Sequence, residues 1–200
     1  MSNDDVWKRI EHAQLLIDIK RPQQAIEQLV RIPQGDPEVA ARVNCTLAQA
    51  HLLLEQKDKA YACARRAIEA SPNDMLSLYW LSSLEPDSLR ALEHATRLVE
   101  MIPDFGVAHA VKARALALNR RWDEALNAAR EGERLDPEDS FVLNTLGRVL
   151  AKNDEKAALD VFKRVLALEP ENAAARESIA LLEADDHADA SSRLFRDLLE

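Results

Sequence analysis

An alanine followed twelve residues later by a proline occurs five times along this 200-residue chain. The pairs are Ala25/Pro37, Ala60/Pro72, Ala91/Pro103, Ala125/Pro137 and Ala158/Pro170. Successive prolines of the set lie 35, 31, 34 and 33 residues apart. A period of about 34 residues is typical of helical repeat arrays, in which each repeat is one helix pair that stacks on its neighbours. The period therefore predicts an all-helical stack that acts through an extended surface.

Each alanine begins a run of apolar residues spaced three and four positions apart, which is one face of a helix. In the fifth repeat this run is Ala158, Leu159, Phe162 and Val165. The proline ends the helix, because it lacks an N–H donor and disfavours helical geometry in the residue before it. Polar residues that can cap the next helix follow the prolines: Glu38, Asn73, Asp74, Asp104, Glu138, Asp139, Ser140, Glu171 and Asn172. Each repeat is thus expected to be two helices joined by a turn.

These residues resemble the tetratricopeptide repeat family. The best match is the fourth repeat, where residues 119–126 are similar to the family's turn into its second helix. Gly147 in the fifth repeat matches the small residue of the first helix, and the equivalent residues are Ala13, Ala48, Ser82 and Ala113. A small residue there lets the two antiparallel helices approach closely. The resemblance implies an all-α fold, a right-handed superhelical solenoid of antiparallel helix pairs.

We expect five repeats within one solenoid domain of residues 6–200, after a flexible start at residues 1–5. Their expected ranges are 6–39, 40–74, 75–105, 106–139 and 140–172, and the third is about three residues short. Residues 173–200 resemble an eroded sixth helix pair. Its second helix either caps the stack, whose end needs a polar outer face, or docks a partner through the apolar residues Leu194, Phe195, Leu198 and Leu199.

The composition narrows the class of function. The formal net charge of −9 and the pI of about 5.1 argue against sequence-independent nucleic-acid binding, which needs clustered Lys and Arg. No apolar run approaches the roughly 20 residues that span a bilayer, so we expect no membrane insertion. The acidic start of the chain is unlike a secretory signal. We therefore expect a cytoplasmic protein, and the excess of Arg over Lys suggests a bacterial source.

The chain carries no constellation of residues that predicts chemistry. Cys45 and Cys63 lack the spacing of a redox or metal motif and are expected to be buried thiols. None of the five histidines has another one helical turn away, as a helical zinc site needs. The polar run of residues 185–189 is read as a surface turn rather than a cation site. We accordingly expect no catalytic residue, no metal and no cofactor, and a protein that is not an enzyme.

The family resemblance also implies that the first helices of the repeats line a concave groove. The inward places carry aromatic and basic residues in an otherwise acidic, aromatic-poor chain. From them we select as a predicted partner-binding groove Trp7, Arg42, Gln49, Tyr79, Trp80, Arg114, Phe141, Asn144, Arg148 and Lys152. The other inward places hold Ile10, Glu11, Gln14, Ile17, Asp18, Cys45, Thr46, Leu52, Leu53, Leu76, Ser83, Val107, Ala110, Val111, Ala117, Leu118, Thr145 and Ala151. Aromatic residues and arginine are typical of binding hot spots. The alternative is that the aromatics pack on neighbouring helices and the arginine stems cover them.

The leading hypothesis is a non-catalytic scaffold for protein–protein interaction. Its groove would bind a protein or peptide with bulky apolar residues and some acidic ones. A second hypothesis is a structural element that forms a homo-oligomer through its C-terminal helix or its solenoid ends. A third is a chaperone for a secreted substrate, because some bacterial secretion chaperones share this repeat.

Overall fold

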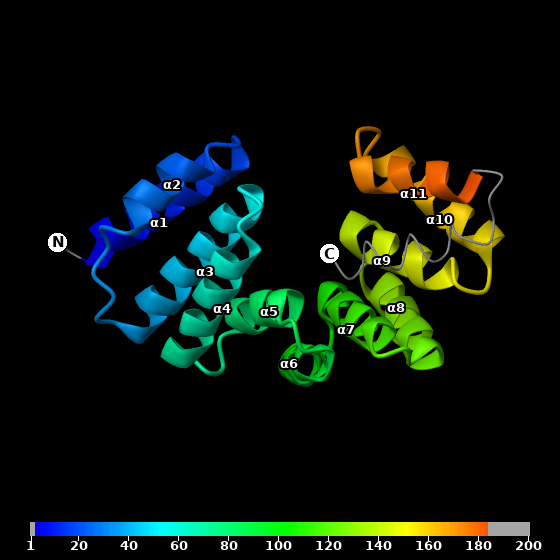
Figure 1. The fold of residues 1–200 in the computed structure, drawn as a ribbon, viewed down its shortest axis with the longest axis horizontal. Helices are drawn as coiled ribbons and strands as arrows, with labels where there is room; N and C mark the ends of the chain where they lie inside the picture. The colour runs from blue at the N-terminus through cyan, green and yellow to red at the C-terminus, as the bar shows by residue number, and fades with distance from the viewer. Residues whose placement is uncertain (1–2, 184–200) are drawn as a thin grey trace. The chain divides into compact units, whose positions relative to one another are not determined.

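The structure of the chain is a computed structural model, which describes residues 3–183 (Figure 1). All regular secondary structure in this range is α-helical, which confirms the all-α fold class. The helices are α1 (Asn3–Asp18), α2 (Pro22–Leu29), α3 (Pro37–Leu53), α4 (Lys57–Ala70), α5 (Met75–Leu84), α6 (Ser88–Met101), α7 (Gly106–Leu118), α8 (Trp122–Leu135), α9 (Ser140–Leu150), α10 (Glu155–Leu168) and α11 (Ala173–Glu183).

The chain forms two compact units, residues 1–94 and 95–200. In the first unit, α1 packs on α2 and α3 on α4, and the first helices α1, α3 and α5 also contact one another in sequence order (Figure 1). In the second unit, α7 packs on α8 and α9 on α10, while α7, α9 and α11 form the corresponding series of first helices. Each unit therefore contains two of the expected helix pairs, and the boundary between the units falls within α6 of the third repeat. A single solenoid domain of residues 6–200 stays a prediction.

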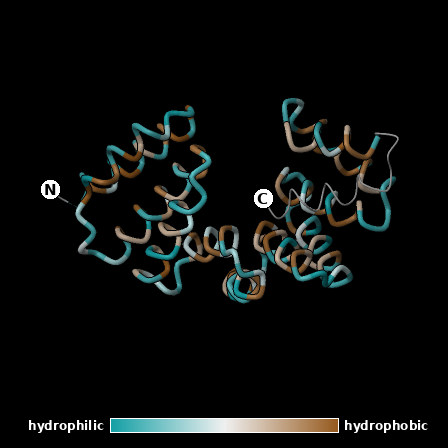
Figure 2. The backbone as a smooth tube through the Cα atoms, viewed as in Figure 1, coloured by the Kyte–Doolittle hydropathy of each residue, from teal (hydrophilic) through white to brown (hydrophobic). Residues whose placement is uncertain are grey.

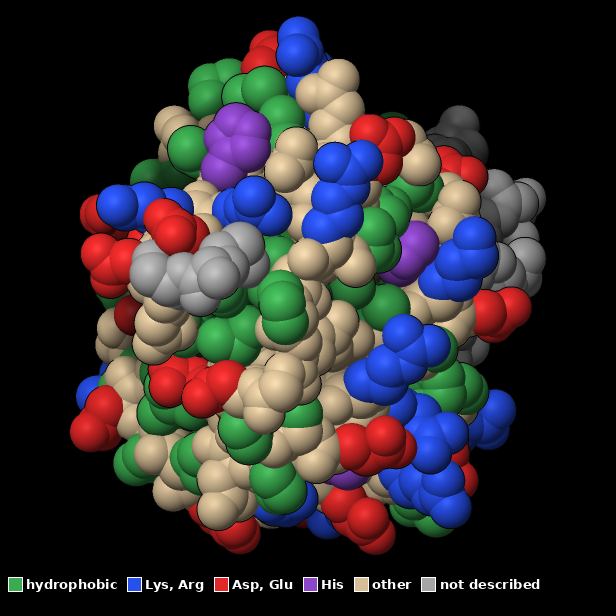
Figure 3. Space-filling model, turned by 90° about the vertical axis from the view of Figure 1, so that its left-hand side faces the viewer, with side chains coloured by type: hydrophobic (Ala, Val, Ile, Leu, Met, Phe, Trp, Pro, Cys, Tyr) green, Lys and Arg blue, Asp and Glu red, His purple; other side chains and the backbone are tan. Residues whose placement is uncertain are grey.

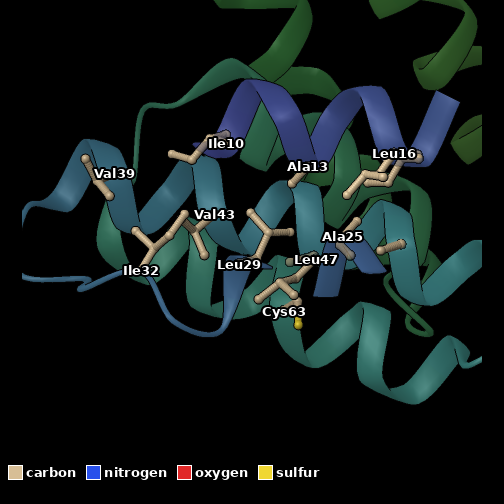
Figure 4. Packing of buried hydrophobic residues seen from close by; sticks show 14 of the residues in the cluster. Ile10, Ala13, Leu16, Ala25, Leu29, Ile32, Val39, Val43, Leu47 and Cys63 are labelled. Atoms are coloured by element: carbon tan, nitrogen blue, oxygen red, sulfur yellow. The ribbon is translucent and has the colours of Figure 1, made fainter. Parts of the chain in front are cut away.

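Small residues are buried at the positions where the sequence predicted close approach of paired helices. Ala13, Ala48, Ser82, Ala113 and Gly147 are all buried in the first helices. The five second-helix alanines that define the period are fully buried as well: Ala25, Ala60, Ala91, Ala125 and Ala158. Figure 4 shows Ala13 and Ala25 within the core of the first unit, among larger side chains such as Leu29 and Leu47. Large residues therefore fill the core between the points where small residues let the helices approach.

The second unit has its own core, centred on Phe162 of α10. Phe162 is fully buried and packs in a cluster with Leu143, Leu146 and Val165. Two glycines of α7 and α8 approach each other closely: a Cβ on Gly132 would lie 2.9 Å from the carbonyl oxygen of Gly106. Figure 2 shows the result along the whole described chain, with hydrophobic stretches in the helices and hydrophilic residues at most of the turns.

The caps of the helices agree with the sequence only in part. Asp74 and Asp139 accept backbone N–H groups of α5 and α9, as expected. The expectation for Glu38 was wrong: the N-cap of α3 is Asp36, whose carboxylate accepts the N–H groups of Glu38 and Val39. Glu38 lies inside the first turn, beyond the N-cap position whose side chain can reach these N–H groups.

The start of α7 is also capped differently from the expectation. Asp104 does not cap it; the N–H of Gly106 instead donates to Asp136, at the end of α8, over 2.7 Å. This bond joins the two helices of the fourth repeat at one end. A carboxylate distant in sequence replaces the local cap, because Gly106 has no side chain to keep Asp136 away.

The start of α1 differs from the sequence-based expectation, and the length of α5 explains why the third repeat is short. Helix α1 begins at Asn3, so residues 3–5, expected to be a flexible start, are helical. Asp4 and Asp5 lie in its first turn, where negative charge stabilises the helix dipole. The third repeat is shortened in its first helix: α5 has 10 residues against 17 in α3. A carboxylate cap by Asp87, which accepts N–H groups of Leu89 and Arg90, then starts α6.

Candidate partner-binding site

Three first helices of the first unit converge on one pocket, which we call the Trp-lined pocket. Its volume is about 590 Å³. Helices α1, α3 and α5 contribute its lining, which consists of Trp7, Ile10, Glu11, Gln14, Arg42, Cys45, Thr46, Gln49, Leu76 and Trp80. All ten are inward places of the sequence analysis. The packing of successive first helices therefore gathers side chains that are up to 73 residues apart in the chain.

The two tryptophans serve both the core and this pocket. Trp7 and Trp80 are half-buried and pack against the apolar core of the first unit. Their remaining surface faces the pocket, together with Ile10 and Leu76. The hypothesis of binding and the alternative of core packing thus both describe these residues. A half-buried indole is held in a fixed orientation, which suits it to receive a bulky apolar group without losing side-chain freedom.

Cys45 of the Trp-lined pocket belongs to a hydrogen-bonded chain with the buried Ser77 and the half-buried Asp74. Ser77 donates its hydroxyl to the Asp74 carboxylate over 2.7 Å, so the Cys45 thiol, 3.4 Å from Ser77 Oγ, is the donor in their contact. Burial raises the pKa of Cys45 to about 12. The thiol is therefore neutral near pH 7 and cannot act as a thiolate nucleophile. Cys45 and Cys63 are both free and buried, as predicted.

The charged residues of the Trp-lined pocket stand on different helices. Glu11 of α1 and Arg42 of α3 are both exposed, and within residues 3–183 neither forms a hydrogen bond or an ion pair through its side chain. Thr46 is satisfied by the carbonyl oxygen of Arg42 at 2.9 Å, and Gln14 by Asp18 at 3.1 Å. The pocket therefore offers an apolar centre with one available cation and one available anion.

The second unit has a more polar site, the Arg-lined pocket, with a volume of about 480 Å³. It contains the predicted residues Arg114 of α7 and Phe141, Asn144 and Arg148 of α9. Thr145, another inward place, also lines it. The other lining residues were missed by the sequence analysis as site residues: Asp139, Ser140, Glu169, Asn172 and Ala174. These five lie at turns and helix starts, where the analysis considered only capping.

A polar network crosses the Arg-lined pocket between two repeats. Glu169 accepts hydrogen bonds from the Ser140 hydroxyl and, over 2.8 Å, from Asn172 Nδ2. These two bonds, that of Ser140 foremost, lower the pKa of Glu169. Asn144 Nδ2 in turn lies 3.4 Å from Asn172 Oδ1. Asn144 Oδ1 is buried and accepts no hydrogen bond from the described residues. Because an unmet buried acceptor costs free energy, this oxygen is suited to accept an N–H from a ligand.

Two predicted groove residues lie outside both pockets. Tyr79 packs edge-on against Trp80, with ring centroids 5.1 Å apart and planes at 77°. Lys152 places its Nζ 5.8 Å from the ring centroid of Trp122, the first residue of α8. Tyr79 thus supports a pocket residue, whereas Lys152 covers the tryptophan of a structural turn. The proposed docking residues Leu194, Phe195, Leu198 and Leu199 lie outside the described residues.

No metal-binding or membrane-spanning feature is evident in residues 3–183. No cluster of three or more His, Cys, Asp or Glu side chains in that range is arranged to hold a metal ion. None of the helices within it combines the length and the apolar character needed to cross a membrane. Acidic and basic side chains are interspersed on the face of the molecule shown in Figure 3. The polar run of residues 185–189 lies beyond the described part of the chain.

The fold and the two pockets define a class of protein: a helical repeat array with side chains of successive first helices gathered on shared surfaces. Residues 41–74, which span most of α3, α4 and the turn that follows, match the tetratricopeptide repeat family model. The match confirms the predicted resemblance to the tetratricopeptide repeat family in this part of the chain. No curated protein matches it in sequence.

Solved structures share this fold at low sequence identity. TTC0263, a thermophilic TPR protein of Thermus thermophilus, has a TM-score of 0.74 and 16% identity, over 88% of this chain and 98% of that one. MamA from Desulfovibrio magneticus RS-1 has a TM-score of 0.63 and 20% identity, with coverages of 86% and 99%. YrrB, described as a TPR protein with an unusual peptide-binding site, has a TM-score of 0.57 and 20% identity, with coverages of 85% and 89%. These likenesses concern the fold.

Proposed function

We propose that this chain is a non-catalytic protein–protein interaction module of the cytoplasm, which binds segments of partner proteins on its first helices. The observation that carries the proposal is the convergence of α1, α3 and α5 on the Trp-lined pocket. Ten residues at inward places of three different repeats meet there, although nothing in their local sequence requires it. The peptide-binding site named for YrrB, which has the same fold, supports a role of this kind.

The chemistry of the two pockets indicates what a partner would present. In the Trp-lined pocket, Trp7 and Trp80 suit a bulky apolar side chain, since aromatic anchors dominate binding energy at interfaces. In the Arg-lined pocket, Arg114 and Arg148 suit a carboxylate, which a guanidinium can bind with two parallel hydrogen bonds. The buried Asn144 Oδ1 suits a peptide N–H. A partner segment with apolar and acidic residues fits both sites.

The absence of a reaction is also part of the proposal. Cys45 of the Trp-lined pocket contacts Ser77, which bonds to Asp74, and a thiol or hydroxyl beside a carboxylate is found in some nucleophilic sites. Here Cys45 has a pKa of about 12, and Ser77 is a buried donor to Asp74, which caps α5. The hydrogen bonds of Cys45, Ser77 and Asp74 therefore support a role in stabilising the start of α5 rather than in catalysis. Turnover lost on changing Ser77 or Cys45 in a correctly folded variant would contradict this part of the proposal.

The test compares two charge reversals in the same repeat. Arg42→Glu changes the Trp-lined pocket on α3, and Arg66→Glu makes the same change on the exposed face of α4, outside both pockets. Proteins retained from a cell lysate by the wild-type chain would be identified by mass spectrometry and then assayed individually as purified partners. We expect Arg42→Glu to weaken the binding of a direct partner about tenfold or more and Arg66→Glu to leave it unchanged. Equal binding by all three chains would move the interaction away from this site.

The Arg-lined pocket is tested in the same way with Arg148→Glu. Its matched control is Arg164→Glu, on α10 of the same repeat, which lies outside the pocket and pairs with Glu133. A partner that depends on Arg148 and not on Arg42 would bind the second unit alone. Circular dichroism of each variant would establish that the helices remain folded.

A further inference from the structure

The buried side of the Trp-lined pocket has donors that are already used. The Thr46 hydroxyl donates to the carbonyl oxygen of Arg42 within its own helix, and the Cys45 thiol donates to Ser77. The half-buried rings of both tryptophans line the same space. An apolar side chain of a partner can therefore fill the centre of the pocket without leaving either of these donors unmet.

The polar groups that stay available in the pocket favour an extended ligand. Among the charged and amide side chains of its lining, three form no hydrogen bond or ion pair within residues 3–183: Glu11, Arg42 and Gln49. The Gln49 amide offers one donor group and one acceptor, which match those of a peptide unit. An extended segment has backbone N–H and C=O groups to pair with this amide, whereas a helix uses its own groups internally.

The period of the sequence indicates how far apart the two charges lie. Ala13 and Ala48 are equivalent small residues 35 positions apart, on the contacting helices α1 and α3. Trp7 is therefore the equivalent of Arg42, and Glu11 follows it by four residues. Packed helices lie about 10 Å apart and four helical residues span about 6 Å, so the backbones at Glu11 and Arg42 are separated by roughly 12 Å. In an extended chain, side chains four positions apart lie on the same face at about 13 Å.

We propose that the Trp-lined pocket binds an extended segment of a partner protein in which a bulky apolar residue stands two positions from an acidic residue and two positions from a basic one. The three side chains then point to the same face. The acidic residue pairs with Arg42, the basic residue pairs with Glu11, and the apolar side chain lies against the tryptophans. The backbone of the segment bonds to Gln49. This inference rests on the proposed function of the pocket and names the chemistry of its ligand.

The experiment measures binding of synthetic nine-residue peptides, fluorescein-labelled at the N-terminus, to the full chain by fluorescence anisotropy. The first probe has aspartate, phenylalanine and lysine at its third, fifth and seventh positions and threonine elsewhere, because β-branched residues favour an extended chain. A second probe exchanges the aspartate and the lysine, since the pattern of side chains is the same in both chain directions. We expect at least one probe to bind saturably and to bind Arg42→Glu and Trp80→Ala about tenfold or more weakly. Arg66→Glu, on the exposed face of α4, should bind as well as the wild-type chain.

The spacing and the exchange of charges are the most specific parts of the test. A peptide whose charged residues directly adjoin the phenylalanine places them on the opposite face of an extended chain, and it should bind about tenfold or more weakly. A peptide with lysine in place of the aspartate should bind the wild-type chain weakly and regain affinity for Arg42→Glu, because the reversed charges again attract. Arg42 is exposed, so its variant tests the site even where Trp80→Ala disturbs the fold.

Two results would overturn the inference: neither probe binds saturably, or the binding is indifferent to Arg42 and to the spacing of the charges. The purified lysate partners of the proposed function separate these results from failure of the pocket itself. If such a partner depends on Arg42 and neither probe does, the pocket binds a ligand of another chemistry. If neither the partners nor the probes depend on Arg42, the inference and the proposed function of this pocket fail together.

Discussion

Gly147 of α9 faces the ring of Phe162 of α10 so closely that a Cβ atom at Gly147 would lie 2.6 Å from Cε1 of that ring. Phe162 is the largest fully buried side chain among residues 3–183. The contact joins the two helices of the fifth repeat at the position where the family resemblance predicted a small residue. Helix approach in this repeat is thus set by the absence of one methyl group.

The first prediction follows from this contact. Gly147→Ala should destabilise the chain by about 1–3 kcal/mol, because the added methyl group overpacks a core that is already filled. Urea unfolding followed by circular dichroism measures this change. Gly35→Ala is the matched control, since no atom lies within 4 Å of a Cβ at Gly35, and it should cause little loss. A second change, Phe162→Leu, should restore part of the stability lost in Gly147→Ala, and independent, additive effects would contradict the proposed clash.

The second prediction concerns the turns that follow α1, α3 and α7. Lys20, Glu55 and Arg120 have φ values of 60°, 58° and 59°, the left-handed region in which side chains are strained. Arg120→Gly should stabilise the chain by roughly 0.5–1 kcal/mol, because the relief of strain exceeds the greater freedom of glycine in the unfolded state. Arg120→Ala retains the Cβ atom and should show no gain. Equal melting curves for the glycine and alanine variants would refute this explanation.

The third prediction tests the cap of α3. Asp36 accepts two backbone N–H groups, at 2.9 and 3.0 Å. Asp36→Ala should cost about 1 kcal/mol of stability, as is typical for the loss of an N-cap. Asp36→Asn keeps an acceptor oxygen and should cost much less. Glu38→Ala should also have a small effect, because Glu38 does not cap the helix; a loss as large as that of Asp36→Ala would restore the sequence-based assignment.

The fourth prediction concerns alkaline pH and the buried thiol of Cys45. Its pKa is raised by burial to about 12 in the folded chain, whereas a thiol in the unfolded chain ionises near pH ~8.5. The folded state therefore holds the proton more tightly, so this contribution to stability is complete below about pH 8.5 and is lost as the pH rises toward 12. Unfolding free energies measured between about pH 8 and 11 should fall more steeply for the wild-type chain than for Cys45→Ala. Parallel profiles would show that Cys45 is accessible or already ionised in the folded state.

Much of the fold could be predicted because its determinants are local and recur. Ala158 was assigned from the period and Gly147 from the family resemblance, and both are buried. The period is informative because two helices must pack closely in every pair, and a small residue at the same position of each pair allows this approach. The N-caps were less predictable. Any carboxylate near a helix start is a candidate from sequence, and Asp36 rather than Glu38 was distinguished only by backbone geometry.

Eight of the ten predicted groove residues line one of the two pockets, and their role in binding stays a prediction. The turn residues that complete the Arg-lined pocket were not predicted. Trp80 lines the Trp-lined pocket and Tyr79 does not, since neighbours on a helix point about 100° apart. Ser140, Glu169 and Asn172 were treated as turn residues, yet their hydrogen bonds form one wall of the Arg-lined pocket. Their contact depends on how the start of α9 packs beside the turn before α11. The spacing of residues within a single repeat cannot predict this contact, because it joins two successive repeats.

The resemblance to the tetratricopeptide repeat family suggested which residues of the first helices point inward. The amino-acid sequence by itself determined that the chain is a series of helix pairs and which face of each helix is buried. These properties follow from the helical period of about 3.6 residues per turn and from the chain-breaking effect of proline, both of which act within a few residues. The tertiary structure decided which inward residues share a pocket, that Glu11 and Arg42 face an apolar centre without a partner among the described residues, and that Cys45 is buried beneath them. Distances between helices and the exclusion of water arise only when separate repeats pack together.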